Sequence, residues 1–299
     1  MAPAGSTSGP ARQSLRTVSL RVFAALPAST RRRFLHARGR YAPWEEGFDF
    51  TPPVLHEGEV TGPPDFVGIG AQKAGTTWWY DLIAAHPQVA CRPDIHKERH
   101  FFDRFATSPF GPADRSRYHG WFPRPSGFVT GEWTPDYVHL PWVPALLAEA
   151  APQTRLLVLL RDPVERLRSG LSHHRRHEGR LDAHACADAV ARGFYEQALA
   201  RWMAYFPSEQ FLLLQYERCL ADPVGQLART YDFLGLAPFV PDGIERRVSS
   251  TRNSVDLDPD TRRRLADLYA PDVVALATHH PDLELDLGRW PNFPSLVTR

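Results

Sequence analysis

The chain has 299 residues, of which 43% are hydrophobic and 23% charged, and its formal net charge at neutral pH is +1. This composition is typical of a globular protein with a sizeable core, and it excludes both a disordered chain and binding to nucleic acid through overall charge. The three cysteines, Cys91, Cys186 and Cys219, show no metal-like spacing and predict free thiols in a reducing, cytoplasmic compartment.

Residues 1–44 differ from the rest because they contain eight arginines and no acidic residue. We expect a basic N-terminal arm that is mobile or loosely packed, although SLRTVSLRVFAAL leaves open an amphipathic helix that binds a membrane surface or a partner. Its apolar run is too short for a secretory signal, and no stretch reaches the roughly 18 apolar residues of a membrane-spanning helix. Residues 45–299 are expected to form a single domain.

Within that domain, buried strands alternate with helices. Continuous apolar runs predict strands over residues 65–70, 155–161 and 211–217. Helices are predicted over residues 76–86, 162–177, 222–236 and 258–280. Apolar strands separated by helices favour an α/β fold, with a parallel sheet flanked by helices on both faces.

The stretch GIGAQKAGTTWW, residues 68–79, follows the first strand and opens the first helix. A glycine turn at a helix N-terminus binds anions through backbone N–H groups. A nucleoside triphosphatase has lysine directly after the second glycine, but here Thr76 follows Gly75, and Lys73 lies in the middle of the loop. The second strand ends in Arg161 rather than in an acid that would hold Mg²⁺. The loop therefore predicts a phosphate site that cations bind directly, without a metal.

The basic residues of the chain support this interpretation of the loop. All 35 are arginine except Lys73 and Lys97, a bias typical of a GC-rich genome. A lysine retained inside the loop indicates a site that needs a compact ammonium group, for which arginine is no substitute.

Other polar segments offer further candidates. HKERHFFD, residues 96–103, contains carboxylates and imidazoles suited to a general base, although surface charge is the alternative. Arg161 and Ser169 are two helical turns apart and are both able to face one phosphate. His173 and His177 have helical i, i+4 spacing, but without a third ligand nearby they indicate a solvated basic helix end rather than a metal site.

Four stretches in this order carry a family resemblance: QKAGTTWWYDLI, HKERHFFD, LLVLLRDPVERLRSGLSHH and ERCLADPVGQLARTYDFLGL. From about residue 65 onward the chain resembles sulfotransferases that use 3′-phosphoadenosine 5′-phosphosulfate (PAPS). It is most similar to the branch that contains Golgi-type heparan sulfate sulfotransferases and bacterial relatives. The resemblance implies a P-loop-NTPase-like α/β fold, PAPS as sulfuryl donor, 3′,5′-ADP as product and no metal.

The resemblance also implies roles for residues around the donor. The side chain of Lys73 would contact the leaving phosphate, and Arg161 with Ser169 would bind the 3′-phosphate. Arg252 is the candidate for a loop that closes over the donor, with Arg246 and Arg247 as alternatives. The implied donor-binding residues are Lys73, Ala74, Gly75, Thr76, Thr77, Arg161, Ser169 and Arg252.

On the acceptor side, the resemblance implies Glu98 as the general base, with His100 as the alternative. We expect Asp103 to orient the acceptor or a neighbouring cation. Glycan-modifying members carry lysine before Thr-Pro, where GEWTPDY has Trp133. A tryptophan there favours an apolar or aromatic acceptor, or a neutral sugar ring, over a heparan-like chain. Core packing of Trp133 is the other interpretation.

We therefore expect a sulfotransferase that moves the sulfuryl group from PAPS to a hydroxyl of a small-molecule or glycoside acceptor. Two other functions stay open. A P-loop kinase or another NTP-using enzyme lacks support from the loop, and a non-catalytic scaffold that uses the basic arm leaves Lys73 and Glu98 unexplained. No nucleic-acid partner is expected, and the sequence does not predict an oligomeric state.

Overall fold

The computed structural model of the chain describes residue 30 and residues 51–244, 255–293 and 296. All elements given below belong to the unit Phe50–Arg299. Apart from residue 30, the arm predicted over residues 1–44 lies outside the described residues, as do Arg252 and its alternatives Arg246 and Arg247. Across the described ranges, no helix combines the length and hydrophobicity that a membrane crossing needs.

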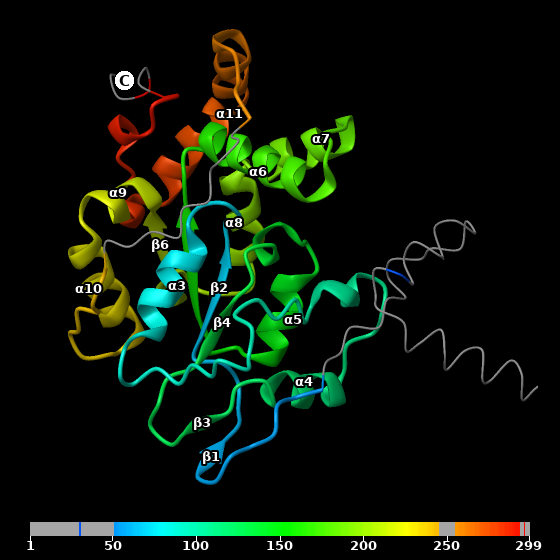
Figure 1. Ribbon diagram of the computed structural model, residues 1–299, viewed down its shortest axis with the longest axis vertical. Helices are drawn as coiled ribbons and strands as arrows, with labels where there is room; N and C mark the ends of the chain where they lie inside the picture. Colours follow the sequence, from blue (N-terminus) through cyan, green and yellow to red (C-terminus); the bar gives the residue numbers. More distant parts are fainter. Residues whose placement is uncertain (1–29, 31–50, 245–254, 294–295, 297–299) are drawn as a thin grey trace, which may run out of the picture. The chain divides into compact units, whose positions relative to one another are not determined.

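The central sheet has four parallel strands in the order β4–β2–β5–β6 (Figure 1). They are β2 (Phe66–Gly70), β4 (Gly131–Trp133), β5 (Arg155–Leu160) and β6 (Phe211–Gln215). Strands β2, β5 and β6 are the three that the apolar runs predict, whereas β4 was not predicted. Every residue of β2 is buried, because the sheet is covered on both faces. A separate antiparallel pair joins β1 (Glu59–Val60) to β3 (Arg124–Pro125).

Helices flank this sheet: α3 and α10 lie on one side of it in Figure 1, and α5 lies on the other. This arrangement confirms the predicted fold class. The helices are α3 (Thr76–Ala84), α4 (Pro112–His119), α5 (Val143–Ala150), α6 (Pro163–Glu178), α7 (Ala183–Ala191), α8 (Tyr195–Met203), α9 (Tyr216–Ala221), α10 (Pro223–Leu234) and α11 (Pro259–His279). Short 3₁₀ helices are η2 (Asp103–Ala106), η3 (Tyr137–His139), η4 (Ser208–Gln210), η5 (Pro281–Leu283) and η6 (Leu287–Arg289). The four predicted helices correspond to α3, α6, α10 and α11.

Three of these helices begin at an Asp-Pro pair. The side chains of Asp162, Asp222 and Asp258 accept backbone N–H groups in the first turns of α6, α10 and α11. Each such cap stabilises a helix by about 1 kcal/mol, and the proline has no N–H to leave unpaired. Because α6 starts directly after β5, the intervening residues Arg161 and Asp162 are fixed at the edge of the sheet.

The glycines of β2 let a tryptophan pack against the strand. A Cβ atom built on Gly68 would lie 2.0 Å from the indole ring of Trp133, and one on Gly70 would lie 2.7 Å from Val138. The Trp133 Nε1 donates a hydrogen bond to the Gly70 carbonyl at 3.2 Å. The GIG stretch is therefore required for close packing beneath the loop.

We predict that Gly68→Ala destabilises the protein by roughly 3 kcal/mol, because the added methyl overlaps a fully buried ring. Urea unfolding measures the change. Gly62→Ala is the matched control, since its Cβ would lie 3.6 Å from the nearest atom of the flexible Arg124 side chain. The control should stay within about 0.5 kcal/mol of the wild type. Equal stability of the two variants would contradict the packing argument.

Candidate active site

The N-terminus of α3 forms an anion-binding turn directly after β2. Gly75 precedes the helix with φ of 94°, and no side chain in the described part of the chain caps it. The first N–H groups of a helix have no partner within the helix, so those of Gly75, Thr76 and Thr77 are available to an anion. Thr76 is buried and Thr77 exposed. The N–H of Ala74 instead bonds the Ala71 carbonyl at 3.2 Å, which closes the turn.

Arg161 lies beneath this turn, at the end of β5. Its Nη1 donates to the Lys73 carbonyl at 3.2 Å, and its guanidinium lies 5.0 Å from the centre of the Tyr216 ring. The same ring would be 2.7 Å from a Cβ on Gly75, so only glycine fits there. Among the described residues, the buried Nε of Arg161 has no hydrogen-bond partner. A buried, unpaired donor on a cation is suited to an anionic ligand.

The side chain of Lys73 is partly buried, and its backbone is left-handed, with φ of 68°. Burial lowers the pKa of Lys73, and the charges of Arg176 and Lys97 lower it further, whereas Glu98 acts in the opposite direction. The charges that act on this pKa thus come from two cations and one carboxylate. Such a concentration of positive charge beside the loop suits a bound phosphate.

The segment after Ile95 carries a chain of alternating charges. Lys97 Nζ donates to Glu98 Oε1 at 2.5 Å, and the other Glu98 oxygen lies 3.4 Å from His100 Nε2. On its far side, His100 Nδ1 lies 2.9 Å from an oxygen of Asp103. The structure therefore brings Glu98, His100 and Asp103 together, with Lys97 paired to Glu98.

This network fixes the protonation states at neutral pH. Burial alone would raise the pKa of Glu98, but hydrogen bonds from His100 and Lys97 outweigh it and lower the pKa to about 2. Hydrogen bonds to Asp103 and then to Glu98 raise the pKa of His100 to about 10. Glu98 is ionised and His100 protonated, so only the carboxylate is ready to accept a proton.

A buried carboxylate on β4 anchors this segment. Glu132 accepts hydrogen bonds from the Tyr118 hydroxyl at 2.7 Å, the Thr134 hydroxyl at 2.6 Å and the Arg99 backbone N–H at 3.3 Å. Burial raises the pKa of Glu132. The bond to Arg99 joins the end of β4 to the backbone next to Glu98. Sequence reasoning missed Glu132. The sequence shows only an acidic residue between Gly131 and Trp133, and the burial of all three residues is known from the structure alone.

Trp133 contributes to the same anchor from within the core. It is fully buried, and its backbone N–H donates to the Lys97 carbonyl at 2.9 Å. Together with the bond from its indole to Gly70, this contact links the candidate donor loop, residues 70–77, to the segment that carries Glu98. These contacts favour core packing over an acceptor contact for Trp133.

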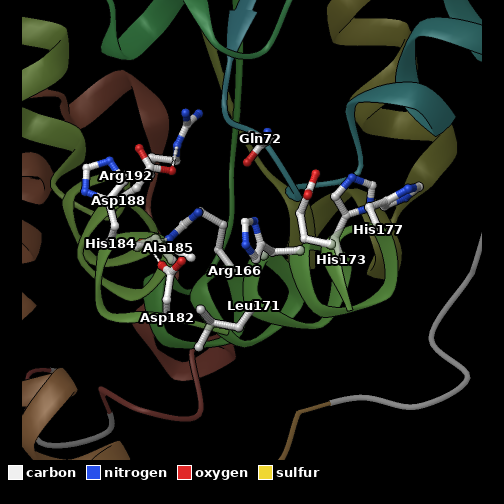
Figure 2. A pocket seen from close by; sticks show the side chains of 14 residues that line it. Gln72, Arg166, Leu171, His173, His177, Asp182, His184, Ala185, Asp188 and Arg192 are labelled. Carbon is white, nitrogen blue, oxygen red and sulfur yellow. Dashed lines mark hydrogen bonds and ion pairs between the residues drawn. The ribbon is translucent and has the colours of Figure 1, made fainter. Parts of the chain in front are cut away.

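Helix α6 carries three further candidates of the sequence analysis: Ser169, His173 and His177. Ser169 is partly exposed on this helix, two turns after Arg161. Further along, the rings of His173 and His177 lie 4.2 Å apart (Figure 2). Burial lowers the pKa of His173, and the charge of Lys73 lowers it further. The described residues contain no cluster of three or more His, Cys, Asp or Glu side chains that could hold a metal.

Asp162 occupies the strand-end position where an NTP-using enzyme needs a magnesium ligand. It is fully buried, and its oxygens accept hydrogen bonds from the backbone N–H groups of Val164 and Glu165 and from Asn292. Burial raises its pKa. Its oxygens are committed to capping α6 and to holding the C-terminal segment, which disfavours the kinase interpretation.

The sequence of the chain is similar to those of known proteins. The chain is 34% identical over 196 residues to heparan sulfate glucosamine 3-O-sulfotransferase 6 of Mus musculus, a match that covers 60% of this chain and 54% of the relative. It is 31% identical over 206 residues to heparan sulfate glucosamine 3-O-sulfotransferase 3A1 of Homo sapiens, covering 63% and 48%. The chain thus spans about half the length of these relatives.

A solved sulfotransferase from Alicyclobacillus acidocaldarius shares the fold, with a TM-score of 0.62 and 24% identity over 77% of this chain and 99% of that one. The family model described as "Sulfotransferase domain" matches residues 63–252. This range is well over half of the chain and contains the donor loop, the charge network and α6. The chain belongs to the sulfotransferase domain family.

Proposed function

We propose that the protein transfers the sulfuryl group of PAPS to a hydroxyl of a small-molecule or glycoside acceptor. One observation carries this proposal: Arg161, whose buried Nε has no hydrogen-bond partner among the described residues, donates to the Lys73 carbonyl at 3.2 Å beside the uncapped N-terminus of α3. The segment that carries Glu98 is tied to the strand before this loop, because Trp133 donates hydrogen bonds to both the Gly70 and the Lys97 carbonyls. The names of the heparan sulfate sulfotransferases support the reaction type.

The donor fits the residues of the loop. The N–H groups of Gly75, Thr76 and Thr77 would hold the 5′-phosphate at the N-terminus of α3. Arg161 and Ser169 would bind the 3′-phosphate, and the unpaired Nε of Arg161 supports a ligand of that charge. Lys73 would contact the oxygen that bridges phosphorus and sulfur.

In the transfer, the acceptor hydroxyl gives its proton to the Glu98 carboxylate and its oxygen forms a bond to sulfur. The bond between sulfur and the bridging oxygen breaks, and its electron pair stays on the phosphate of 3′,5′-ADP. The ammonium of Lys73 stabilises the charge that builds on this leaving oxygen. The protein's contribution is thus a positioned base on one side and a positioned cation on the other.

His100 and Asp103 act as positioning residues in this scheme. A protonated His100 held by Asp103 orients the Glu98 carboxylate through the 3.4 Å contact. The Lys97 ion pair keeps Glu98 ionised but makes it a weak base. An acceptor hydroxyl that replaces Lys97 at Oε1 would raise the basicity of Glu98 at the moment when it is needed.

The first prediction concerns the donor site. In calorimetry with EDTA present, 3′,5′-ADP should bind 10-fold or more tightly than 5′-AMP, because each charge-assisted bond to the 3′-phosphate contributes about 1.5–3 kcal/mol. Arg161→Gln should remove most of this preference. Arg155→Gln, at the other end of β5, is the matched control and should keep it. Equal affinity of the wild type for the two nucleotides would overturn the assignment.

The second prediction concerns His100. Its ring should stay protonated above pH 8 in an NMR titration, since two carboxylates raise its pKa to about 10 from an ordinary 6.5. The folded-state pKa exceeds the unfolded one, so the stability that His100 contributes is fully present below pH 6.5. This contribution is lost as the pH rises toward 10. Asp103→Asn should lower the titration midpoint. A midpoint near 6.5 in the wild type would contradict the network and restore His100 as a candidate base.

The third prediction concerns Lys73. Lys73→Arg should reduce kcat on the order of 10²–10³-fold, nearly as much as Lys73→Ala, because a planar guanidinium does not fit a tight turn and follow the leaving oxygen. Steady-state rates at saturating PAPS give the comparison, and the affinity for 3′,5′-ADP serves as the folding and binding control. An Arg variant with wild-type kcat would show that the site needs only positive charge.

A further inference from the structure

The C-terminal segment, residues 281–293, follows α11 and lies outside the range that matches the sulfotransferase domain. It contains η5 and η6 and runs beside the end of β6 and α9 (Figure 1). Because β2 and β6 are both parallel to β5, the donor loop and this segment lie at the same edge of the sheet. That edge, at the carboxyl ends of the strands, is where α/β folds of this kind bind ligands.

The segment is bonded to both sequence neighbours of Tyr216, the first residue of α9. Before it, Gln215 exchanges two hydrogen bonds with the backbone of Asp286: its Nε2 donates to the carbonyl at 3.0 Å, and its Oε1 accepts the N–H at 2.9 Å. After it, Glu217 Oε2 accepts a hydrogen bond from Trp290 Nε1 at 2.8 Å. The segment therefore holds the backbone that carries the Tyr216 ring from both sides.

The same segment supports the backbone of Arg161, whose guanidinium lies against that ring. The peptide bond between Arg161 and Asp162 is held at both of its polar groups. The Tyr195 hydroxyl donates to the Arg161 carbonyl at 2.8 Å, and the Asp162 N–H donates to Glu217 Oε1 at 3.1 Å. Trp290 bonds Glu217 and packs on Tyr195, with ring centres 6.5 Å apart. It thus contacts both side chains that hold this peptide bond.

Asn292 adds a second link to the same place. Its backbone N–H and its side-chain Nδ2 both donate to Asp162 Oδ2, at 3.1 and 2.9 Å. The other oxygen of Asp162 caps the first turn of α6, the helix that carries Ser169. Asn292 therefore supports the junction between the two residues that would bind the 3′-phosphate, Arg161 and Ser169.

The donors of the segment satisfy acidic oxygens that lie away from water. Asp162 is fully buried and Glu217 partly buried, and burial raises the pKa of both carboxyl groups. A carboxylate oxygen that loses its donor in such surroundings is unfavourable, so the side chain would move to find another partner. Both acids are tied to the backbone at Arg161, and their movement would displace the arginine.

We propose that the C-terminal segment is part of the donor site, in which Trp290 and Asn292 are positioning residues that hold Arg161 for the 3′-phosphate of PAPS. The inference rests on the proposed function and adds to it a segment outside the matched domain. A guanidinium binds phosphate strongly only when its donors face the phosphate oxygens, so displacing Arg161 weakens the contact even though its charge is kept.

Calorimetry with EDTA present tests the inference by comparing 3′,5′-ADP with 5′-AMP, which lacks the 3′-phosphate. Trp290→Phe keeps an aromatic ring and removes the donor to Glu217. We expect its affinity for 3′,5′-ADP to fall about 5-fold or more, because part of a charge-assisted contact is lost, with the affinity for 5′-AMP within about twofold of the wild type. A purely structural role would lower both affinities equally or neither, and either result would overturn the inference.

A second variant keeps the test independent of the folding of the first. Asn292→Ala removes one of the two bonds to Asp162 at a partly exposed position and should show the same split between the two nucleotides. Arg229→Gln is the matched control, because it removes a bond to the Asp282 carbonyl that holds the same segment from α10. The control should keep both affinities. Loss of the 3′-phosphate preference in the control would contradict the assignment to Trp290 and Asn292.

A double variant shows whether Trp290 acts through Arg161. Added to Arg161→Gln, Trp290→Phe should lower the affinity for 3′,5′-ADP by less than about twofold, since residues that serve one contact are not additive. A further loss as large as in the wild-type background would overturn the inference.

The wild type separates the two levels of the proposal. Equal affinity of the wild type for the two nucleotides would overturn the donor site itself and the inference with it. A wild-type preference for 3′,5′-ADP that persists in both Trp290→Phe and Asn292→Ala would overturn the inference alone.

Discussion

The carboxylate of Glu98 is held between two cations, and the rest of the site depends on this arrangement. Lys97 and His100 each contact one of its oxygens, and Asp103 in turn keeps His100 protonated. A half-buried carboxylate without these partners would tend toward its neutral form, which accepts no proton. The network therefore sets both the charge and the orientation of the Glu98 carboxylate, the candidate base.

The fold holds this network against the donor loop through a few buried contacts. The indole Nε1 of Trp133 donates a hydrogen bond to the Gly70 carbonyl at the end of β2, and its backbone N–H donates one to the Lys97 carbonyl. Because Gly68 leaves room for the ring, Trp133 holds both the segment that carries Glu98 and the strand that leads into the Lys73 loop. A base and a cation that act on opposite sides of a transferred group need such a fixed separation, since small displacements reduce the rate steeply.

Much of this architecture is predictable from the sequence because the signals are local. Apolar runs locate β2, β5 and β6, and Asp-Pro caps locate α6, α10 and α11. Helices α7 and α8 were not predicted. Helix α7 is largely exposed and alanine-rich, so it lacks a clear apolar pattern. Helix α8 is short and amphipathic, and such a helix is stabilised mainly by tertiary packing. The short strand β4 has three residues and takes its conformation from pairing with β2.

The site was predictable only in part, for a similar reason. The positions of Lys73, Glu98 and Arg161 follow from spacing and resemblance, whereas the role of Glu132 depends on partners that are distant in sequence, such as Tyr118. Trp133 illustrates the limit, because one side chain fits a sugar or a core equally well until its surroundings are known.

The most direct measurement of the central claim is the PAPS-dependent turnover of Glu98→Gln, compared with its affinity for 3′,5′-ADP. The substitution keeps the shape of the side chain and removes its ability to accept a proton. The account predicts a loss of turnover on the order of 10²–10⁴-fold, the usual weight of a general base, with nucleotide affinity unchanged. Normal turnover in this variant, together with an inactive His100→Ala, would contradict the account and make the histidine the base.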